Sequence, residues 1–299
     1  MRRPAVVLVA AICLSILHLS AHTTPAVAPL QAPDADAVRD RLDAYLRAYE
    51  PQLSSLVAEE LLIQRDGPSR EASLTAAPDT KNRRLISEVA FISLPGGAGW
   101  LGFRRAVNLN GKDLPDAGPP LGVLLTDDDK DDYDQARLLI SESARLNLGL
   151  PRTTNLPNLP LEFLHPRNRR RFAHRVDGTE KIRGLHTTRI VLDETSSPTM
   201  IQRPEGGDMT SSVMAWVETA TGRLIRAQVK TRDARIGVLP FDALVWVDFK
   251  LDEKLGLLVP AEMKEEFFAG RFREGTGTAR YTKYRRFQTA ARIIPSPGS

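Results

Sequence analysis

The basic run Arg167-Asn168-Arg169-Arg170-Arg171, with Arg175 beyond it, contains side chains that can bind anions. Guanidinium groups bind phosphate and carboxylate oxygens in paired hydrogen bonds, so this run would suit phosphate head groups or another polyanion. In a strand, Arg169 and Arg171 would share one face, with Arg175 further along. The sequence predicts Arg169, Arg171 and Arg175 as candidate anion contacts, and a solvated or edge strand guarded by charge is the alternative.

Six aspartates occur in the eight residues from Asp127 to Asp134, a composition that raises the question of calcium. An EF-hand loop requires Gly at its sixth position and a carboxylate at its twelfth. Counted from Asp127, these positions hold Asp132 and Leu138. Acidic residues ahead of a helix are explained by capping and by the helix dipole, so we expect a helix start here rather than a metal site.

The sequence lacks the motifs of common catalytic and metal centres. His165, His174 and His186 do not stand at metal-ligand spacing beside a carboxylate. There is no Gly-x-Ser-x-Gly elbow, no Walker loop and no dinucleotide fingerprint. We therefore expect no catalytic residue, no metal and no cofactor. A hydrolase that assembles Ser, His and Asp from distant positions stays open as an alternative.

The N-terminus predicts export. Arg2 and Arg3 precede the apolar run Ala5–Leu17, and small residues follow between Ala21 and Ala28. This order is that of a signal peptide, here residues 1–28, with cleavage between Ala21 and Ala28 and a leader at 29–33. An uncleaved anchor is the alternative. The mature protein would be periplasmic or secreted, and it would contain no cysteine because Cys13 is the only one in the chain.

Composition excludes several classes of protein. The 299 residues are 42% hydrophobic and 26% charged, which permits a sizeable core and argues against a disordered chain. The net charge of +4 is too small to favour nucleic acid as a partner. We expect one envelope domain over residues 34–290 and a flexible tail over residues 291–299, whose composition is rich in Pro and Ser.

Hydrophobic periodicity predicts the elements that would position any site. Val38 to Tyr49 has the spacing of an amphipathic helix, and Tyr133 to Leu148 that of a second, inserted helix. Ser212 to Lys230 alternates on both sides of a Thr-Gly turn, which is typical of a β-hairpin. Turns are expected at Asn110-Gly111 and Asp177-Gly178. Further strands are predicted at 59–64, 84–94, 100–108, 168–176, 184–193, 242–251, 257–268 and 276–287.

These elements give an α+β fold: a curved antiparallel sheet, or incomplete β-barrel, with an N-terminal helix and an inserted helix packed on it. Large aromatic residues are spread over the last strands. Trp216, Trp246, Phe249 and Phe267 are the candidates to line an apolar ligand pocket. Ordinary core packing of the same aromatic residues is the alternative.

Three segments resemble the LolA/LolB-like periplasmic lipoprotein carriers, and the whole mature chain resembles uncharacterised exported bacterial proteins. The segments are the hairpin Trp216–Arg226, the Pro-containing strand Leu257–Met263 and the closing strand Ala279–Phe287. The resemblance covers about residues 167–287 and implies an incomplete barrel with helices over an apolar cavity. This chain departs from the family in having an additional N-terminal half.

From these features we expect a non-catalytic bacterial envelope protein that binds an apolar or lipid-like ligand in a half-barrel. Its expected partners are a lipid or a lipoprotein, with peripheral contact to a membrane and none to nucleic acid. The alternatives are an interaction or scaffold module with a filled core and the dispersed-site hydrolase.

Overall fold

The computed structural model describes residues 34–67, 81–93, 100–115, 117–124, 144, 146–148, 155–202, 207–236, 239–269 and 272–286. Contacts within the chain divide it into residues 1–32 and residues 33–299, and all described residues belong to the second unit. The aspartate run and almost all of the helix expected from Tyr133 lie outside the described residues, as does the expected signal peptide.

Helix α1 (Ala35–Leu53) confirms the helix expected at Val38 to Tyr49. Its N-terminus is capped by Asp34, whose carboxylate accepts a hydrogen bond of 3.0 Å from the backbone N–H of Asp36. The other helical segments are α2 (Leu121–Leu124), α4 (Leu159–Leu164) and the 3₁₀ helix η2 (Pro166–Arg171). Among the described helices, none combines the length and apolar character needed to span a membrane.

Ten of the twelve described strands overlap predicted strands, whereas β4 and β7 lie in segments for which no strand was predicted. Their bounds are β1 (Leu56–Asp66), β2 (Lys81–Ser93), β3 (Trp100–Leu109), β4 (Lys112–Asp113), β5 (Phe172–Ile182), β6 (Leu185–Glu194), β7 (Ile201–Gln202), β8 (Asp208–Glu218), β9 (Leu224–Ile236), β10 (Leu239–Asp252), β11 (Leu257–Ala269) and β12 (Phe272–Arg286).

The described strands form one 12-stranded antiparallel sheet in the order β4-β3-β2-β1-β12-β11-β10-β9-β8-β6-β5, with β7 paired to β8. Most neighbours in this order are also neighbours in sequence. The exception that joins the two ends of the chain is the pairing of β1 with β12, from Leu56 opposite Arg286 to Asp66 opposite Gly275. The sheet is open, with β4 and β5 at its edges, and the α+β prediction is confirmed.

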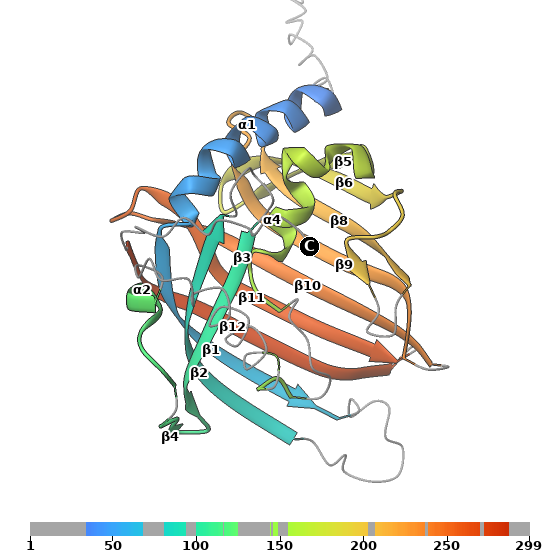
Figure 1. Ribbon diagram of the computed structural model, residues 1–299. Coiled ribbons are helices and arrows are strands. Elements are labelled where there is room, and N and C mark those ends of the chain that lie inside the picture. Colours follow the sequence, from blue (N-terminus) through green and yellow to red (C-terminus); the bar gives the residue numbers. More distant parts are fainter. Residues whose placement is uncertain are drawn as a thin grey trace, which may run out of the picture. The chain divides into compact units, whose positions relative to one another are not determined.

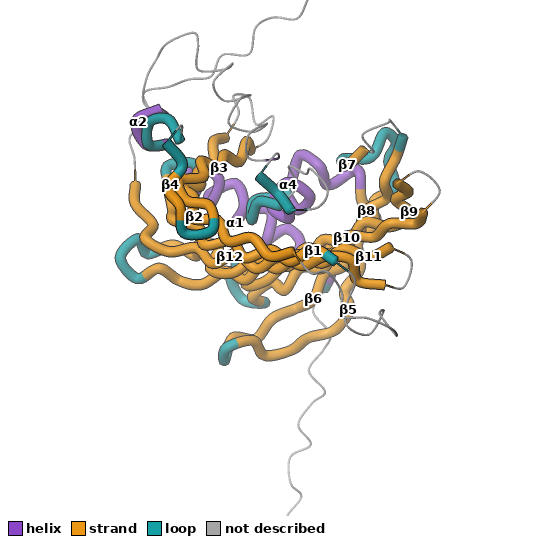
Figure 2. Tube along the Cα trace, turned by 90° about the horizontal axis from the view of Figure 1, so that it is seen from below, coloured by secondary structure: helices purple, strands orange, loops and turns teal. Residues whose placement is uncertain are grey.

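The sheet curves around its helices. Figure 1 shows α1 lying across one end of the sheet and α4 in front of the strands, and Figure 2 shows the strands bending around both helices. We call the side that carries α4 the concave face. Its central strands contribute Val213, Ala215, Ala227, Val247 and Phe249, all at most 1% exposed and in one core cluster with the α1 and α4 side chains. The opposite, convex face has a small separate core of Val57, Ala90, Ile92, Phe103 and Leu121.

Two local predictions were wrong. The segment from Asn168 does not begin a strand, because residues 166–171 form η2, which starts at Pro166 and is capped by His165, and β5 begins only at Phe172. The turn expected at Asp177-Gly178 is a register shift inside β5. The hairpin turns at Arg183-Gly184, where φ is 49° and 82°, as a two-residue turn of this kind requires.

Candidate functional site

The candidate site is the concave face of the sheet together with α1 and α4, which cover it. Helix α1 packs through Val38, Leu42, Leu46, Tyr49 and Leu53, each at most 1% exposed. These residues recur every three or four positions, so they form a single stripe along the helix. Helix α4 adds Leu161, Phe163 and Leu164, which are equally buried. In the structure, apolar side chains of the two helices therefore occupy the space above the central strands.

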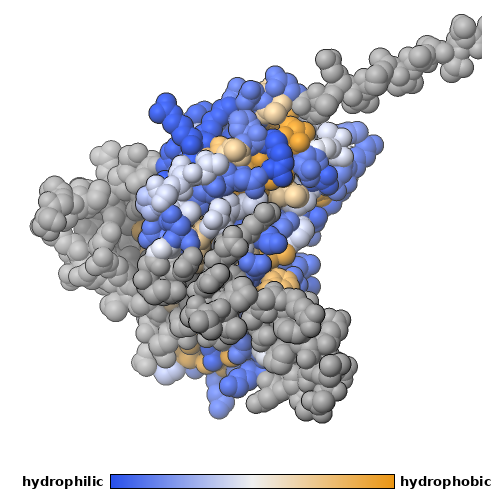
Figure 3. All heavy atoms as spheres, turned by 90° about the vertical axis from the view of Figure 1, so that its right-hand side faces the viewer, coloured by the Kyte–Doolittle hydropathy of each residue, from blue (hydrophilic) through white to orange (hydrophobic). Residues whose placement is uncertain are grey.

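Each fully buried apolar side chain contributes about 1.5–3 kcal/mol relative to an exposed one. Moving α1 away is consequently unfavourable unless another apolar group replaces it on the sheet. On the face of the molecule shown in Figure 3, hydrophilic residues predominate among the described atoms, and the hydrophobic ones form small separate patches. Apolar side chains of α1 and α4 therefore cover the part of the concave face that they contact.

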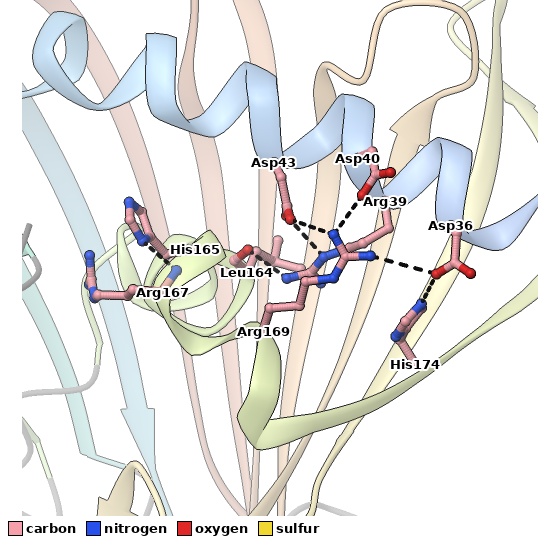
Figure 4. A network of polar contacts seen from close by, with 9 residues as sticks. All are labelled: Asp36, Arg39, Asp40, Asp43, Leu164, His165, Arg167, Arg169 and His174. Atoms are coloured by element: carbon pink, nitrogen blue, oxygen red, sulfur yellow. Dashed lines mark hydrogen bonds and ion pairs between the residues drawn. The ribbon is translucent and has the colours of Figure 1, made fainter.

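Figure 4 shows an ion-pair network that fixes the N-terminal half of α1 to η2 and β5. The guanidinium of Arg169 lies 2.6 Å from Asp40, 3.1 Å from Asp43 and 3.6 Å from Asp36. His174 completes the network with a contact of 3.1 Å between its Nε2 and the Asp36 carboxylate. The hydrogen bond from Arg169 lowers the pKa of the Asp40 carboxyl. We call these five residues the α1 ion-pair network.

Beneath this network lies a buried arginine. Arg39 is 1% exposed; its Nε donates to Asp43 at 3.0 Å and its Nη2 donates to the backbone carbonyl of Leu164 at 3.0 Å. Among the described residues, its Nη1 has no hydrogen-bond partner, and neither do the buried hydroxyls of Tyr49 and Ser54. A buried polar group without a partner costs about 1–3 kcal/mol. The packing of α1 thus combines many buried apolar side chains with polar atoms that have no partner among the described residues.

His165 connects η2 to the C-terminal half of α1. Its Nε2 lies 2.9 Å from the Glu50 carboxylate, and its Nδ1 accepts a hydrogen bond of 3.3 Å from the backbone N–H of Arg167. A neutral imidazole with its proton on Nε2 satisfies both contacts, whereas a proton on Nδ1 would face the Arg167 N–H. Burial lowers the pKa of His165 below its ordinary value of 6.5, against the opposing effect of Glu50.

Acidification is therefore expected to break the hydrogen bond from the Arg167 N–H, because a protonated Nδ1 can no longer accept it. Because the folded state holds His165 neutral, the unfolded state binds more protons, and the free energy of unfolding should fall as pH drops below about 6.5. The measurement is a two-dimensional NMR titration of the imidazole together with thermal unfolding at pH 7.5 and 5.5. His165→Gln keeps a donor and an acceptor but cannot titrate, so it should reduce the pH dependence.

His186 provides the control, because its side chain is exposed whereas that of His165 is buried. His186→Gln should leave the pH dependence of unfolding unchanged. A His165 pKa measured at or above 6.5 in the folded protein would contradict the assignment of a buried neutral ring.

A second, polar region of the concave face lies on β1, β3 and β11. Arg104 forms a bidentate pair with Glu60, with distances of 2.5 and 2.8 Å, and neither side chain is more than 1% exposed. The same guanidinium donates to the side-chain and backbone oxygens of Asn155, at 3.1 and 2.7 Å. Gln64 donates to Glu265 at 3.1 Å beside them. Because these groups bind one another, this region fastens the segment at Asn155 to the sheet rather than presenting reactive groups.

The structure separates the four aromatic residues expected to line one pocket. Phe249 lies on the concave face and is 1% exposed. Trp216 and Trp246 lie on the convex face, where their rings stack at 5.8 Å. Phe267 is half-buried opposite Gly275, near the end of β11. Side chains alternate along a strand, and Trp246 and Phe249 are three residues apart on β10, so their spacing already indicated opposite faces. That these four aromatic residues contact a ligand remains a prediction.

The three arginines named as candidate anion contacts all face carboxylates of this chain. Arg169 belongs to the α1 ion-pair network, Arg171 lies 3.5 Å from Glu194, and Arg175 pairs with Asp193 on β6. They do not share a strand face, because Arg169 and Arg171 lie in η2. Sequence reasoning missed Asp36, Asp40 and Asp43 as the partners of Arg169, although the three acids follow one side of α1 at intervals of three and four residues.

Within the described part of the chain, no cluster of three or more His, Cys, Asp or Glu is arranged to hold a metal ion. His165 and His174 are instead engaged by Glu50 and Asp36. The expectation of a protein without a metal or a catalytic residue stays a prediction.

Comparisons with known proteins concern the fold alone. No model of a protein family matches this chain, and no curated protein matches its sequence. Among solved structures, a DUF1329 family protein from Desulfovibrio piger is 11% identical, with a TM-score of 0.39, over 85% of this chain and 93% of its own. A LolA superfamily protein from Nitrosomonas europaea is 13% identical, with a TM-score of 0.33, over 86% of this chain and 94% of its own.

A domain from Vibrio parahaemolyticus named for outer membrane lipoprotein sorting is 12% identical, with a TM-score of 0.39, over 86% of this chain and 94% of its own. Two of these similar structures are thus named for the LolA superfamily or for lipoprotein sorting, the group that the strand sequences resemble. At these identities and TM-scores, the function has to be argued from the residues of this chain.

Proposed function

We propose that this is a non-catalytic protein of the bacterial envelope that binds an apolar or lipid-like ligand on the concave face, with α1 as a movable cover. One observation supports the proposal above all. The apolar stripe of α1 covers the end of a curved apolar surface, while the polar side of the helix is fixed mainly through Arg169 and His174. An acyl chain could replace the α1 side chains on the sheet, at about 0.8 kcal/mol per buried CH₂.

The proposal includes the place where the protein works. Residues 1–28 are proposed to be removed on export, with the domain of residues 34–290 acting in the periplasm or outside the cell. Two of the structurally similar proteins are named for the LolA superfamily and for lipoprotein sorting, so a lipid or a lipoprotein is the proposed ligand class.

Weakening the α1 ion-pair network should increase ligand binding. Arg169→Glu replaces the cation between Asp36, Asp40 and Asp43 with a fourth negative charge. Because Arg169 makes three contacts and each pair at the surface is weak, the affinity should rise by about a hundredfold at most. The measurement is a titration of the purified mature protein with a fluorescent fatty acid, together with organic extraction of lipid that co-purifies with it.

Arg170→Glu is the matched control, since it makes the same charge change one residue away. Arg170 is exposed and has no ion pair with another described residue. The Arg170→Glu variant should bind the fluorescent fatty acid with the same affinity as the natural protein. If folded natural protein and folded Arg169→Glu both carry no lipid and bind no fatty acid saturably, the ligand proposal is wrong. A scaffold whose core is permanently filled by α1 and α4 would then take its place.

A further inference from the structure

The convex face has a groove of about 370 Å³ between β9, β10 and β11, within the size range of small-molecule sites. It lies on the side of the sheet opposite α4, so it is separate from the proposed lipid site. Its lining residues belong to three adjacent rungs of the sheet, a rung being a row of residues that stand opposite one another on neighbouring strands. The lining residues are Arg226, Leu244, Trp246, Asp248, Glu262, Lys264 and Glu266.

The register of the strands explains why these side chains meet. Arg226 on β9 stands opposite Asp248 on β10, and Asp248 stands opposite Glu262 on β11. On the next rung, Trp246 stands opposite Lys264. Side chains directly opposite on one face of an antiparallel sheet lie about 4.5–5.5 Å apart at Cβ, so the groove is a continuous surface on rigid strands.

The indole ring of Trp246 forms one wall of the groove and packs against a second indole ring. Trp246 lines the groove and stacks on Trp216 with 5.8 Å between ring centroids and 25° between ring planes. Trp216 is itself held, because its Nε1–H donates to Glu180 and the Arg226 guanidinium lies 5.8 Å from its ring. Two contacts thus hold Trp216 in place, and Trp216 in turn supports the ring of Trp246. A flat apolar surface of this kind suits stacking with a ring that has a C–H or π face.

Four of the charged lining groups form two ion pairs. Arg226 pairs with Asp248 at 2.9 Å, and Lys264 pairs with Glu262 at 3.0 Å. Arg280, outside the groove lining, adds a further contact to Glu262 at 3.4 Å. Guanidinium and ammonium groups donate hydrogen bonds and carboxylates accept them, so the groove offers donors and acceptors side by side. Three carboxylates against two cations disfavour a phosphate-rich ligand.

From this arrangement we infer that the convex groove binds a neutral oligosaccharide. A sugar ring presents a C–H face that stacks on Trp246 and hydroxyl groups that both donate and accept. The Arg226–Asp248 and Lys264–Glu262 pairs supply the matching partners. The alternative is a stretch of sheet in which aromatic stacking and ion pairs serve only to stabilise neighbouring strands.

The inference is tested by titrating the natural protein with N-acetylated chitotriose and with maltotriose, two neutral trisaccharides. Tryptophan fluorescence is the first readout, because two of the three tryptophans of the chain lie at this groove. Calorimetry gives the affinity independently. Saturable binding of either sugar is expected, weakened roughly tenfold or more by Trp246→Ala and less by Trp246→Phe, which keeps a ring.

Lysine variants keep the test decisive if Trp246→Ala fails to fold. Lys264 and Lys283 are both exposed and both pair with a glutamate, but only Lys264 lines the groove. Lys264→Ala should weaken sugar binding severalfold, and Lys283→Ala should leave it unchanged. The inference is overturned if the folded natural protein binds neither sugar at millimolar concentrations. It is also overturned if binding occurs but Lys264→Ala and Trp246→Phe leave it unaltered.

Discussion

Gly222→Ala is expected to destabilise the protein strongly and to force α1 from its position. Gly222 ends the β8–β9 turn with φ of 77°, and an added Cβ would lie 2.3 Å from the Arg41 carbonyl oxygen and 2.4 Å from its carbon. These are backbone atoms inside α1, so neither can rotate away. A side chain in the left-handed region costs about 1–2 kcal/mol, and overpacking adds about 1–3 kcal/mol. Urea unfolding followed by circular dichroism measures the loss.

Gly184→Ala separates the backbone cost of a side chain at positive φ from the cost of overpacking against α1. Gly184 also lies in a hairpin turn, with φ of 82°, but no atom of the described part of the chain lies within 4 Å of an added Cβ there. This variant should show only the backbone cost of about 1–2 kcal/mol. Equal destabilisation by Gly222→Ala and Gly184→Ala would mean that the turn does not press on α1. If α1 covers a ligand site, a Gly222→Ala protein that still folds should also bind the fluorescent fatty acid more tightly.

Arg104→Met is expected to cost about 3–5 kcal/mol, because it leaves the Glu60 carboxylate buried without its cation. The side chains of this pair are 1% and 0% exposed, so water cannot replace the lost contacts without rearrangement. The substitution also removes both hydrogen bonds to Asn155. The measurement is the free energy of unfolding in urea at pH 7.

Two further variants show whether burial is the cause. Arg175→Met breaks the pair with Asp193, whose side chains are 59% and 44% exposed, and should cost about 0–1 kcal/mol. Replacing both partners in Arg104→Met/Glu60→Leu should recover much of the loss, because an apolar pair of similar volume can substitute for a buried ion pair. If the double variant is as unstable as Arg104→Met alone, the loss of stability comes from the lost Asn155 contacts. It then does not come from a buried Glu60 carboxylate without its cation.

The local elements of the fold could be predicted from the sequence. The stripe on α1, the alternation in β8 and β9, and the turn at Asn110-Gly111 involve residues only a few positions apart. Their geometry depends on side-chain period and on φ, which the residue types themselves constrain. The class of the fold followed from the number and spacing of such segments.

The start of β5 could not be predicted in the same way. The basic run from Arg167 has no clear hydrophobic period, so its sequence is compatible with either a charged strand or a helical turn. The carboxylates of α1 pair with Arg169 in η2, and these carboxylates lie more than a hundred positions earlier in the chain. Likewise, the pairing of β1 with β12 joins residues over two hundred positions apart, from Leu56 to Arg286. Local sequence contains no signal for such contacts.

The candidate sites show the same division. Alternation along β10 assigned Trp246 and Phe249 to opposite faces, but it did not say which face the helices would cover. Only the docking of α1 and α4 made Phe249 part of the core and left Trp246 at a groove on the other side. Sequence by itself determined the strands, the turns and the amphipathic helix, since these depend on neighbouring residues. The tertiary structure decided which face is buried and which charges meet, because both depend on contacts between distant parts of the chain.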